Sequence, residues 1–315
     1  MRRKKTILVT GGLGFIGQAI SLSLSRNNSV IIIDNNFRKK NIDKLKKNNI
    51  KIINADITNE KNLYKIKQKI DCVVHLAFIN GTNYFYENPQ LVLNVGIKGI
   101  INIIDFCKKK SIREFFLASS SEVYQNAKKI PTNEEVPLII PDPHNPRYSY
   151  GAGKIISEIM LINCDYFKRS VIFRPHNIYG PNMGYNHVIP ELIKKIRSSQ
   201  KKITIQGKGQ ETRAFCYIDD FISAFNILIK KGKNKNIYNI GTEEEVKIKD
   251  LTNRVIKLSN KRISIKKSIE KKGNAKRRCP DIKKIKKLGY KPEFNLNKGL
   301  KITYDWYLKD LNNEI

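Results

Sequence analysis

The stretch Lys4–Gly17, KKTILVTGGLGFIG, decides the fold of this chain. Its apolar run, Thr6 to Thr10, is typical of a buried strand and leads into a glycine-rich turn, after which a helical pattern of apolar residues begins. Such a strand–turn–helix unit can bind a pyrophosphate, because backbone N–H groups and the positive end of the helix dipole face the anion and no Cβ blocks its approach. By itself the motif is also compatible with a plain tight turn. The predicted cofactor contacts here are Gly11, Gly14, Phe15, Ile16 and Gly17.

A second apolar run, residues 29–33, supports a dinucleotide site because it ends in an acidic residue, Asp34. An acidic side chain at this place in a dinucleotide-binding sheet meets the adenosine ribose hydroxyls. Its carboxylate would repel a 2′-phosphate, so the sequence favours NAD over NADP. Arg38 and Lys39 argue the other way, since a basic pair can neutralise a phosphate.

Apolar runs alternate with helical segments along the first half of the chain. The runs that predict strands lie at residues 6–10, 29–33, 50–54, 71–76, 113–119 and 170–174. This alternation predicts an α/β fold, a Rossmann-like doubly wound parallel sheet. The second half is richer in prolines and turns, which predicts a smaller C-terminal lobe that binds the substrate. The expected domains are 1–175, joined by about 212–240, for the cofactor and 176–315 mainly for the substrate.

The ends of the third and fourth predicted strands supply further cofactor contacts. Asp56 is expected near adenine, and it can also cap a helix that starts at Asn59. His75 is expected to be a packed strand-end residue rather than a catalytic one. The cofactor contacts predicted at these two strand ends are Asp56, Ile57, Leu76 and Ala77.

The fifth predicted strand ends in three serines and a carboxylate, SSSE, at the edge of the sheet where ligands bind. Downstream, Tyr150 and Lys154 are four residues apart and share one face of an amphipathic helix. A nearby ammonium stabilises a phenolate, so Tyr150 can take a proton from a hydroxyl group. Tyr124 and Lys128 form a second copy of this spacing, but the copy lacks a helical pattern and is interpreted as accidental.

The composition limits the possible partners. The net charge is +32, from 60 basic and 28 acidic residues. Because the lysines are spread along the chain and accompany many Asn and Ile residues, we expect no nucleic-acid partner, only a field that favours an anionic substrate. There is no run of 18 apolar residues, so no membrane span is expected. The five scattered cysteines have no metal-binding spacing, which predicts no metal site and a cytoplasmic location.

Taken together, the glycine turn, Asp34, the serines, Tyr150 and Lys154, and Arg174–Pro181 (RPHNIYGP) make the chain resemble the extended short-chain dehydrogenase/reductases that act on nucleotide-sugars. The likeness covers nearly the whole chain. It implies that Ser120 orients the substrate hydroxyl, that Tyr150 is the acid/base, and that Lys154 is its partner. It also implies NAD as the cofactor and a nucleotide-sugar as the substrate. The substrate diphosphate contacts that it implies are Asn177, Arg213 and Arg278.

Departures from the family's subgroups bear on the reaction. The 4,6-dehydratases carry an Asp-Glu pair after the active-site hydroxyl, whereas this chain has Ser121 and Glu122, which disfavours dehydration. UDP-glucuronate decarboxylases share the Ser-Glu pair and an Arg-x-Pro segment like Arg278–Pro280. Glu122 is therefore a candidate catalytic residue, with a strand-end residue bonded to backbone donors as the alternative. Gly96 replaces an asparagine that is frequent in the family.

The resemblance and the residues favour an NAD-dependent nucleotide-sugar epimerase that works through a transient 4-keto sugar. A UDP-glucuronate decarboxylase is the first alternative, and a non-catalytic NAD-binding scaffold or sensor is the second. Residues 78–88 and 183–187 are expected to line the sugar pocket. Helices expected at 90–108 and 150–166 carry apolar residues on more than one face, which predicts a homodimer.

Overall fold

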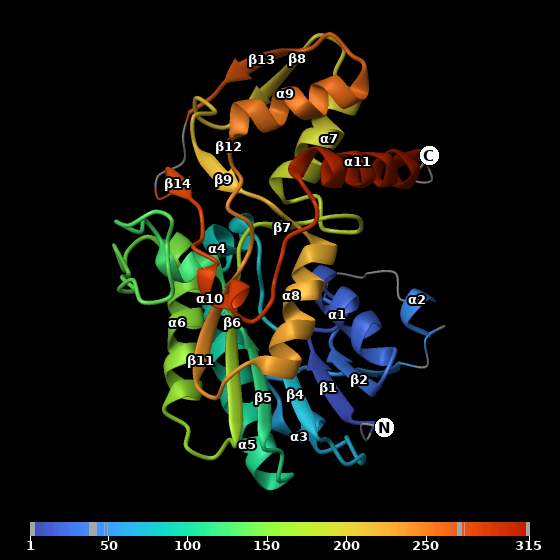
Figure 1. Ribbon diagram of the computed structural model, residues 1–315, viewed down its shortest axis with the longest axis vertical. Helices are drawn as coiled ribbons and strands as arrows, with labels where there is room; N and C mark the ends of the chain where they lie inside the picture. Colours follow the sequence, from blue (N-terminus) through green and yellow to red (C-terminus); the bar gives the residue numbers. More distant parts are fainter. Residues whose placement is uncertain are drawn as a thin grey trace. The chain divides into compact units, whose positions relative to one another are not determined.

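The computed structural model describes residues 4–37, 43–46, 48, 50–269, 273 and 275–312. The chain forms two compact units (Figure 1). The first comprises Met1–Val123, Leu138–Arg174 and Phe225–Tyr238, and the second comprises Tyr124–Pro137, Pro175–Ala224 and Asn239–Ile315. The predicted division of roles between cofactor-binding and substrate-binding parts stays a prediction.

A seven-stranded sheet is the centre of the first unit. Its strands, in their order across the sheet, are β11 (Asn236–Ile240), β6 (Arg169–Pro175), β5 (Glu114–Ala118), β4 (Cys72–His75), β1 (Thr6–Thr10), β2 (Ser29–Asp34) and β3 (Lys51–Asn54). The strands from β6 across to β3 pair in parallel. The predicted α/β fold class is confirmed. All six predicted strands are present, and β11 is a strand that the apolar pattern did not predict.

The order of the strands determines where a ligand can bind. From β1 the chain runs outward through β2 to β3, and it then returns to β4 on the other side of β1 and continues through β5 to β6. In such open sheets the crevice lies outside the carboxyl ends of the strands, at the point where the order reverses. Here that point lies between β1 and β4, where Thr10 and His75 are register partners.

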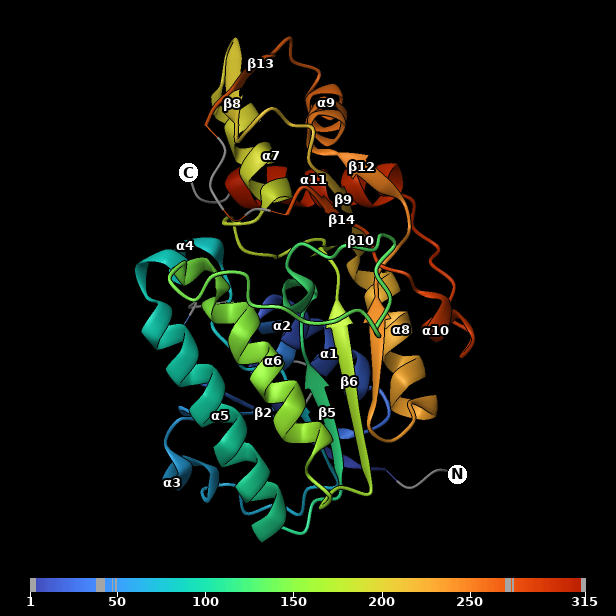
Figure 2. The ribbon, with the colours of Figure 1, turned by 90° about the vertical axis from the view of Figure 1, so that its left-hand side faces the viewer.

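Helices cover both faces of this sheet. The helices of the first unit are α1 (Phe15–Ser25), α2 (Asp43–Lys46), α3 (Glu60–Leu63), α4 (Thr82–Glu87), α5 (Pro89–Lys109) and α6 (Ser149–Ile162), with the 3₁₀ helices η1 (Ser121–Tyr124) and η2 (Pro146–Tyr148) and the C-terminal half of α8 (Ile218–Lys231). Helices α5 and α6 lie side by side over one face (Figure 2). Phe115 and Leu117 share a buried cluster with α5, whereas Phe116 between them contacts Phe225 of α8 at 6.3 Å between ring centroids. This alternation is that of a strand buried on both sides.

Helix α5 is the core helix of the first face. Its residues Ile100, Ile103 and Phe106 are at most 1% exposed and belong to the main buried cluster. Among the residues that the structure describes, α5 alone is long and apolar enough to cross a membrane by length and composition, and 44% of that stretch is buried inside the fold. Its apolar character therefore has a sufficient explanation in the packing of α5 on the sheet.

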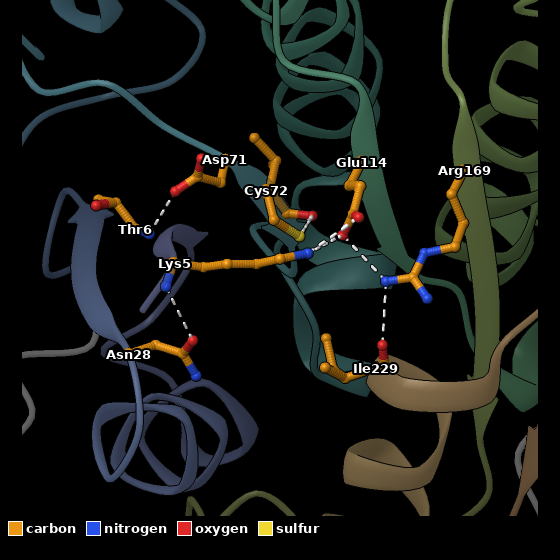
Figure 3. A network of polar contacts seen from close by, with 9 residues as sticks. Lys5, Thr6, Asn28, Asp71, Cys72, Glu114, Arg169 and Ile229 are labelled. Atoms are coloured by element: carbon orange, nitrogen blue, oxygen red, sulfur yellow. Dashed lines mark hydrogen bonds and ion pairs between the residues drawn. The ribbon is translucent and has the colours of Figure 1, made fainter. Parts of the chain in front are cut away.

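A polar network joins the amino ends of the strands (Figure 3). The Glu114 carboxylate accepts hydrogen bonds from Lys5 Nζ at 2.9 and 3.0 Å and from Arg169 Nη2 at 3.0 Å. Arg169 Nη2 also donates to the carbonyl of Ile229, and the Asp71 carboxylate accepts from the backbone N–H of Thr6 at 2.8 Å. The network thus links β1, β5 and β6 to α8 at the edge opposite the ligand crevice.

The second unit is less regular. Its elements are β7 (Ile178–Tyr179), α7 (Val188–Ser198), β8 (Lys202–Ile205), β9 (Thr212–Ala214), β10 (Cys216–Tyr217), β12 (Glu245–Lys247), α9 (Ile248–Ser259), β13 (Ser264–Lys267), β14 (Arg277–Arg278), α10 (Lys283–Lys286) and α11 (Leu296–Asn312), with the N-terminal half of α8. Its strands form three small sheets, ordered β10-β7, β12-β9-β14 and β13-β8. The sheet that contains β9 and β14 aligns two of the predicted substrate residues.

Candidate active site

The glycines between β1 and α1 are needed for different structural reasons. Gly11 has a φ of +69°, and a Cβ there would lie 2.7 Å from the backbone of Ala77. A Cβ on Gly17 would lie 2.3 Å from the carbonyl oxygen of Gly11. Gly14 differs, because its Cβ would meet only that same oxygen, at 3.4 Å. Gly11 and Gly17 let the turn close, whereas Gly14 leaves open space beside the helix N-terminus.

This N-terminus fits the pyrophosphate of a dinucleotide. Gly14 is the N-cap of α1 and provides no side-chain cap, and the first turn, which contains Phe15 and Ile16, holds no acidic residue. The first N–H groups of a helix lack intrahelical partners, and the helix dipole adds positive potential there. An anion at this position is stabilised by both effects.

Asp34 lies at the end of β2, directly beside the glycine turn. Its carboxylate accepts hydrogen bonds from the backbone N–H groups of Leu13 at 3.0 Å and Asn36 at 2.8 Å. The turn that would bind the pyrophosphate and the carboxylate expected at the ribose are therefore fixed to one another. Arg38 and Lys39 lie outside the described residues.

At the end of β3, Asp56 organises a turn rather than the helix itself. Its Oδ1 accepts hydrogen bonds from the N–H and the hydroxyl of Thr58, both at 2.8 Å. The expectation that Asp56 caps the following helix is wrong, because α3 begins at Glu60 and its N-cap is Asn59, which accepts from Lys61 N–H. Ile57 is 5% exposed, so its side chain packs, and its carbonyl accepts a hydrogen bond of 2.8 Å from the Asn102 side chain.

The end of β4 is fixed by Thr10. The Thr10 hydroxyl accepts from the N–H groups of Leu76 and Ala77, each at 3.3 Å, and lies 2.7 Å from His75 Nδ1. The direction of the Thr10–His75 hydrogen bond depends on the tautomer of His75. Burial, together with the charge of Lys154, lowers the pKa of His75 to about 3. His75 is thus a neutral, packed residue at the end of β4, and Thr10 positions the loop that carries Leu76 and Ala77.

Beyond β5, Ser120 and Glu122 lie on a tight 3₁₀ turn. Ser120 Oγ accepts a hydrogen bond from the Glu122 N–H at 3.1 Å, which leaves its hydrogen for another acceptor. The Glu122 carboxylate lies 3.3 Å from Nη2 of Arg147, a residue that is 6% exposed in η2. A guanidinium is thus among the partners of Glu122.

Tyr150 and Lys154 lie on α6 in the predicted register. Lys154 is 2% exposed, and its Nζ donates a hydrogen bond of 2.6 Å to the carbonyl of Ala118 at the end of β5. Burial lowers the pKa of Lys154 to about 7, although Glu158 one turn later opposes the shift. Tyr150 is 6% exposed and packs between Phe78 and Phe85. The pair therefore lies next to the strand that leads to Ser120.

The second Tyr-x-x-x-Lys copy has a structural role. Tyr124 is 4% exposed, and its hydroxyl donates a hydrogen bond of 2.8 Å to the side-chain carbonyl of Asn239. His176 Nε2 lies 3.0 Å from the same oxygen. Lys128 is exposed and lies in no helix. Tyr124 is part of a buried network of the second unit.

The second unit brings together the residues predicted to contact the diphosphate. Arg213 of β9 and Arg278 of β14 are register partners in parallel strands, so their side chains leave the same face of the sheet. Asn177, with a φ of +42°, donates a hydrogen bond of 3.1 Å to the carbonyl of Ala214, next to Arg213. Two guanidinium groups on one face of a sheet suit an anion, because their planar donors match its oxygens in pairs.

Three residues that contact the candidate site could not be recognised from the sequence. Arg147 forms an ion pair with Glu122, which lies 25 residues earlier in the sequence. Thr10 binds the backbone of the Leu76–Ala77 loop, and Phe78 packs on Tyr150. The one sequence feature related to the position of Phe78 is Gly96, because the absence of a side chain at Gly96 makes room for the Phe78 ring. The expected pocket loop at 78–88 is in part wrong, since 82–87 form helix α4 and Phe85 is 2% exposed.

Comparisons with known proteins agree with this geometry. The model of the NAD dependent epimerase/dehydratase family matches residues 7–241. The chain belongs to this family. The predicted family and NAD as its cofactor are thereby confirmed, and the chain is an enzyme of the epimerase/dehydratase group, whose members act on nucleotide-sugars.

Its relatives in this family carry out different reactions. A putative UDP-glucose 4-epimerase of Methanocaldococcus jannaschii is 34% identical over 95% of this chain and 97% of its own length. A dTDP-D-glucose 4,6-dehydratase of Dictyostelium discoideum is 34% identical over 80% of this chain, which spans 62% of that relative's length. UDP-glucuronic acid decarboxylase 1 of Xenopus tropicalis is 30% identical over 99% of this chain and 74% of its own.

Among solved structures, a UDP-N-acetylglucosamine 4-epimerase from Methanobrevibacter ruminantium M1, in complex with UDP-N-acetylmuramic acid, superposes with a TM-score of 0.86. It is 28% identical to this chain and covers 98% of it and 99% of its own chain.

Proposed function

We propose that this chain is a nucleotide-sugar epimerase that oxidises its substrate to a transient 4-keto sugar and returns the hydride to that sugar. The observation that carries the proposal is the position of Lys154, bonded at 2.6 Å to the backbone of β5 at Ala118, two residues before Ser120. This bond fixes the helix of Tyr150 against the strand that leads to the hydroxyl predicted to orient the substrate. A tyrosine–lysine pair so placed suits proton removal from a sugar hydroxyl.

Each residue of the site has a part in this reaction. NAD, when bound, supplies hydride acceptance and return. Tyr150 removes the proton from the sugar hydroxyl in the oxidation and gives it back in the reduction. Ser120, whose hydrogen is left for an acceptor by its bond from the Glu122 N–H, holds the reacting oxygen. Lys154 stabilises the phenolate by its charge.

The nucleotide-sugar is expected to be held by its diphosphate. Asn177, Arg213 and Arg278 are the proposed contacts, and the alignment of Arg213 with Arg278 supports them. A guanidinium suits this role because its planar donors match phosphate oxygens in pairs. The solved relative with UDP-N-acetylmuramic acid supports a substrate of this class.

Ser121 argues against dehydration. It stands where the 4,6-dehydratases carry the aspartate of their acid–base pair, and it is 4% exposed at the start of η1. A serine hydroxyl is too weak an acid to replace a carboxyl group in eliminating water. Relatives of the dehydratase class are similar in sequence, but this residue favours an epimerase.

A decarboxylase acting on a UDP-hexuronate is the second candidate function. The pairing of Glu122 with Arg147 favours it, because this pair places a cation and a carboxylate beside the Ser120 turn. In such a reaction the same 4-keto step makes the C6 carboxylate a β-keto acid that loses CO₂. The Arg278–Pro280 segment and the Xenopus relative point in the same direction.

A panel of UDP-, GDP-, CDP- and dTDP-sugars, with products analysed by mass and NMR, tests the proposal. An unchanged mass with an inverted stereocentre supports an epimerase. Loss of CO₂ identifies the decarboxylase, and loss of water contradicts the argument from Ser121. Tight NAD binding without turnover of any sugar indicates the non-catalytic alternative.

A further inference from the structure

Phe78, the residue after Ala77, occupies a slot between α5 and α6. The slot exists because two residues that face it lack a Cβ. A Cβ on Gly96 would lie 2.1 Å from Phe78 Cζ, and one on Gly153 would lie 2.8 Å from the same atom. Both separations are far shorter than a carbon–carbon contact, so this position of the ring requires both glycines.

The Phe78 ring contacts both members of the Tyr150–Lys154 pair. Its centroid lies 5.0 Å from that of Tyr150, with the two planes at 82°. Lys154 Nζ lies 4.4 Å from the same Phe78 centroid. The first geometry is the edge-to-face arrangement that aromatic pairs prefer, and the second is a cation–π contact.

Phe85 of α4 also contacts the Tyr150 ring. Its ring is stacked on Tyr150 with centroids 4.9 Å apart and planes at 15°. Ile79, Phe85, Val92 and Tyr150 form a buried cluster of their own, against which Phe78 packs. The segment after β4 therefore holds the phenol ring through Phe78 and Phe85.

We propose that Phe78 is a positioning residue for proton transfer at Tyr150. Wedged into the slot that Gly96 and Gly153 leave, its ring fixes the phenol of Tyr150 and the ammonium of Lys154 in one mutual arrangement. The inference rests on the proposed function, in which Tyr150 is the acid/base. A misplacement of a catalytic group by about 1 Å costs on the order of 10²-fold in rate. Removal of the Phe78 ring, called the wedge below, should therefore lower the rate measurably.

The first experiment compares kcat, KM and NAD affinity in Phe78→Ala and Phe78→Leu. We expect kcat to fall about 10- to 100-fold in Phe78→Ala, and less in Phe78→Leu, which keeps most of the packed volume. NAD affinity is expected to stay within about twofold, because the glycine turn is untouched. Phe167→Leu is the control, since Phe167 is buried in the main core of the same unit, and we expect this variant to keep kcat near the wild-type value. A Phe78→Ala enzyme with wild-type kcat, or one whose loss is explained by weaker NAD binding, overturns the proposal.

The second experiment tests the slot itself. Gly96→Ala alone places a methyl group on the Phe78 ring and is expected to lower kcat about as much as Phe78→Ala. In the Phe78→Ala background the ring is gone, so Gly96→Ala is expected to have little further effect. Losses that simply multiply in the double variant contradict a wedge, because independent sites are additive in free energy.

The third measurement does not depend on any substrate. In protein carrying ring-labelled tyrosine, the flipping rate of the Tyr150 ring can be followed by NMR, with its signal assigned by its loss in Tyr150→Phe. We expect faster flipping in Phe78→Ala and an unchanged rate in Phe167→Leu. An unchanged rate in Phe78→Ala overturns the wedge even if the enzyme is active. Faster flipping in a chain that turns over no nucleotide-sugar supports the wedge and refutes the proposed function instead.

Discussion

Glu158 of α6 binds Arg174 at the end of β6 through two hydrogen bonds, 2.9 Å to Nε and 2.6 Å to Nη2. The two side chains are 3% and 1% exposed, so the pair is buried. Glu158 lies one helical turn after Lys154 and two turns after Tyr150, on the same face of α6. The pair therefore fixes the rotation and height of the helix that carries the candidate acid/base against the sheet.

Breaking this pair should be costly. We expect Glu158→Gln or Arg174→Met to lower the free energy of unfolding by about 3–5 kcal/mol, because each leaves its partner buried without a counter-charge. Replacing both with apolar residues should cost much less, since buried pairs roughly balance against well-packed apolar substitutes. Denaturant unfolding of the three variants measures this. A loss in the double variant equal to the sum of the two single losses would show that the pair is not coupled.

The Glu114 network predicts how stability changes with acid. Burial alone would raise the pKa of Glu114, but hydrogen bonds and charges from Lys5 and Arg169 outweigh burial and lower it below the ordinary value. The folded state therefore binds this proton less readily than the unfolded state. The resulting stabilisation is fully present above the unfolded pKa and is lost as the pH falls through the lower folded value. Glu114→Gln should remove this part of the acid dependence, measured as unfolding free energy between pH 7 and pH 3. A variant whose pH dependence matches that of the wild type would contradict the network's role.

Asp34 should make the enzyme prefer NAD. Its carboxylate is fixed by the N–H groups of Leu13 and Asn36, so it cannot turn away from a 2′-phosphate without losing both bonds. We expect apo-enzyme to bind NAD at least tenfold more tightly than NADP, and Asp34→Asn to narrow that ratio, since a bond to a charged group contributes about 1.5–3 kcal/mol. Calorimetric titration of both cofactors measures the ratio. Equal affinities in the wild type would indicate that Arg38 and Lys39 neutralise the phosphate.

The exposed apolar residues of α5 and α6 predict a homodimer. Ile101 on α5 and Ile156 and Ile159 on α6 are 39%, 37% and 53% exposed, although the opposite sides of both helices are buried. A second copy of this face would cover them. Light scattering at micromolar concentration should give twice the chain mass, and Ile159→Glu should give the monomer mass. A wild-type chain that is monomeric under these conditions contradicts the prediction.

The features that could be predicted from the sequence are those whose residues lie close together along the chain. The glycine turn, the strand that precedes it and the Tyr150–Lys154 register each depend on residues within a few positions of one another. The contacts that escaped prediction join distant segments, as when Arg147 meets Glu122 or Phe78 fills the space at Gly96 and Gly153. Strand β11 was missed because NIYNI is short and its apolar residues are interrupted by asparagine. It also begins more than 60 residues after β6 ends, so only the folded sheet shows its place. Asp56 and Asn59 both suit an N-cap, and only the backbone geometry assigns the cap to Asn59.

Tyr150→Phe should abolish turnover and leave NAD bound. The substitution removes the phenolic oxygen but keeps the ring between Phe78 and Phe85, so packing and the glycine turn are unchanged. General acid–base catalysis contributes about 10²–10⁴-fold, and we expect a loss near the upper end because hydride transfer depends on removal of the hydroxyl proton. Steady-state rates and NAD titration measure the two effects separately.

Tyr124→Phe is the matched control, because Tyr124 has the same spacing to a lysine but donates its hydroxyl hydrogen to Asn239. It should lose some stability, since a buried acceptor loses its partner, and should keep its rate within about tenfold. An inactive Tyr124→Phe beside an active Tyr150→Phe would move the acid/base to the other tyrosine. Activity in both variants would rule out a tyrosine-based hydride mechanism for this chain.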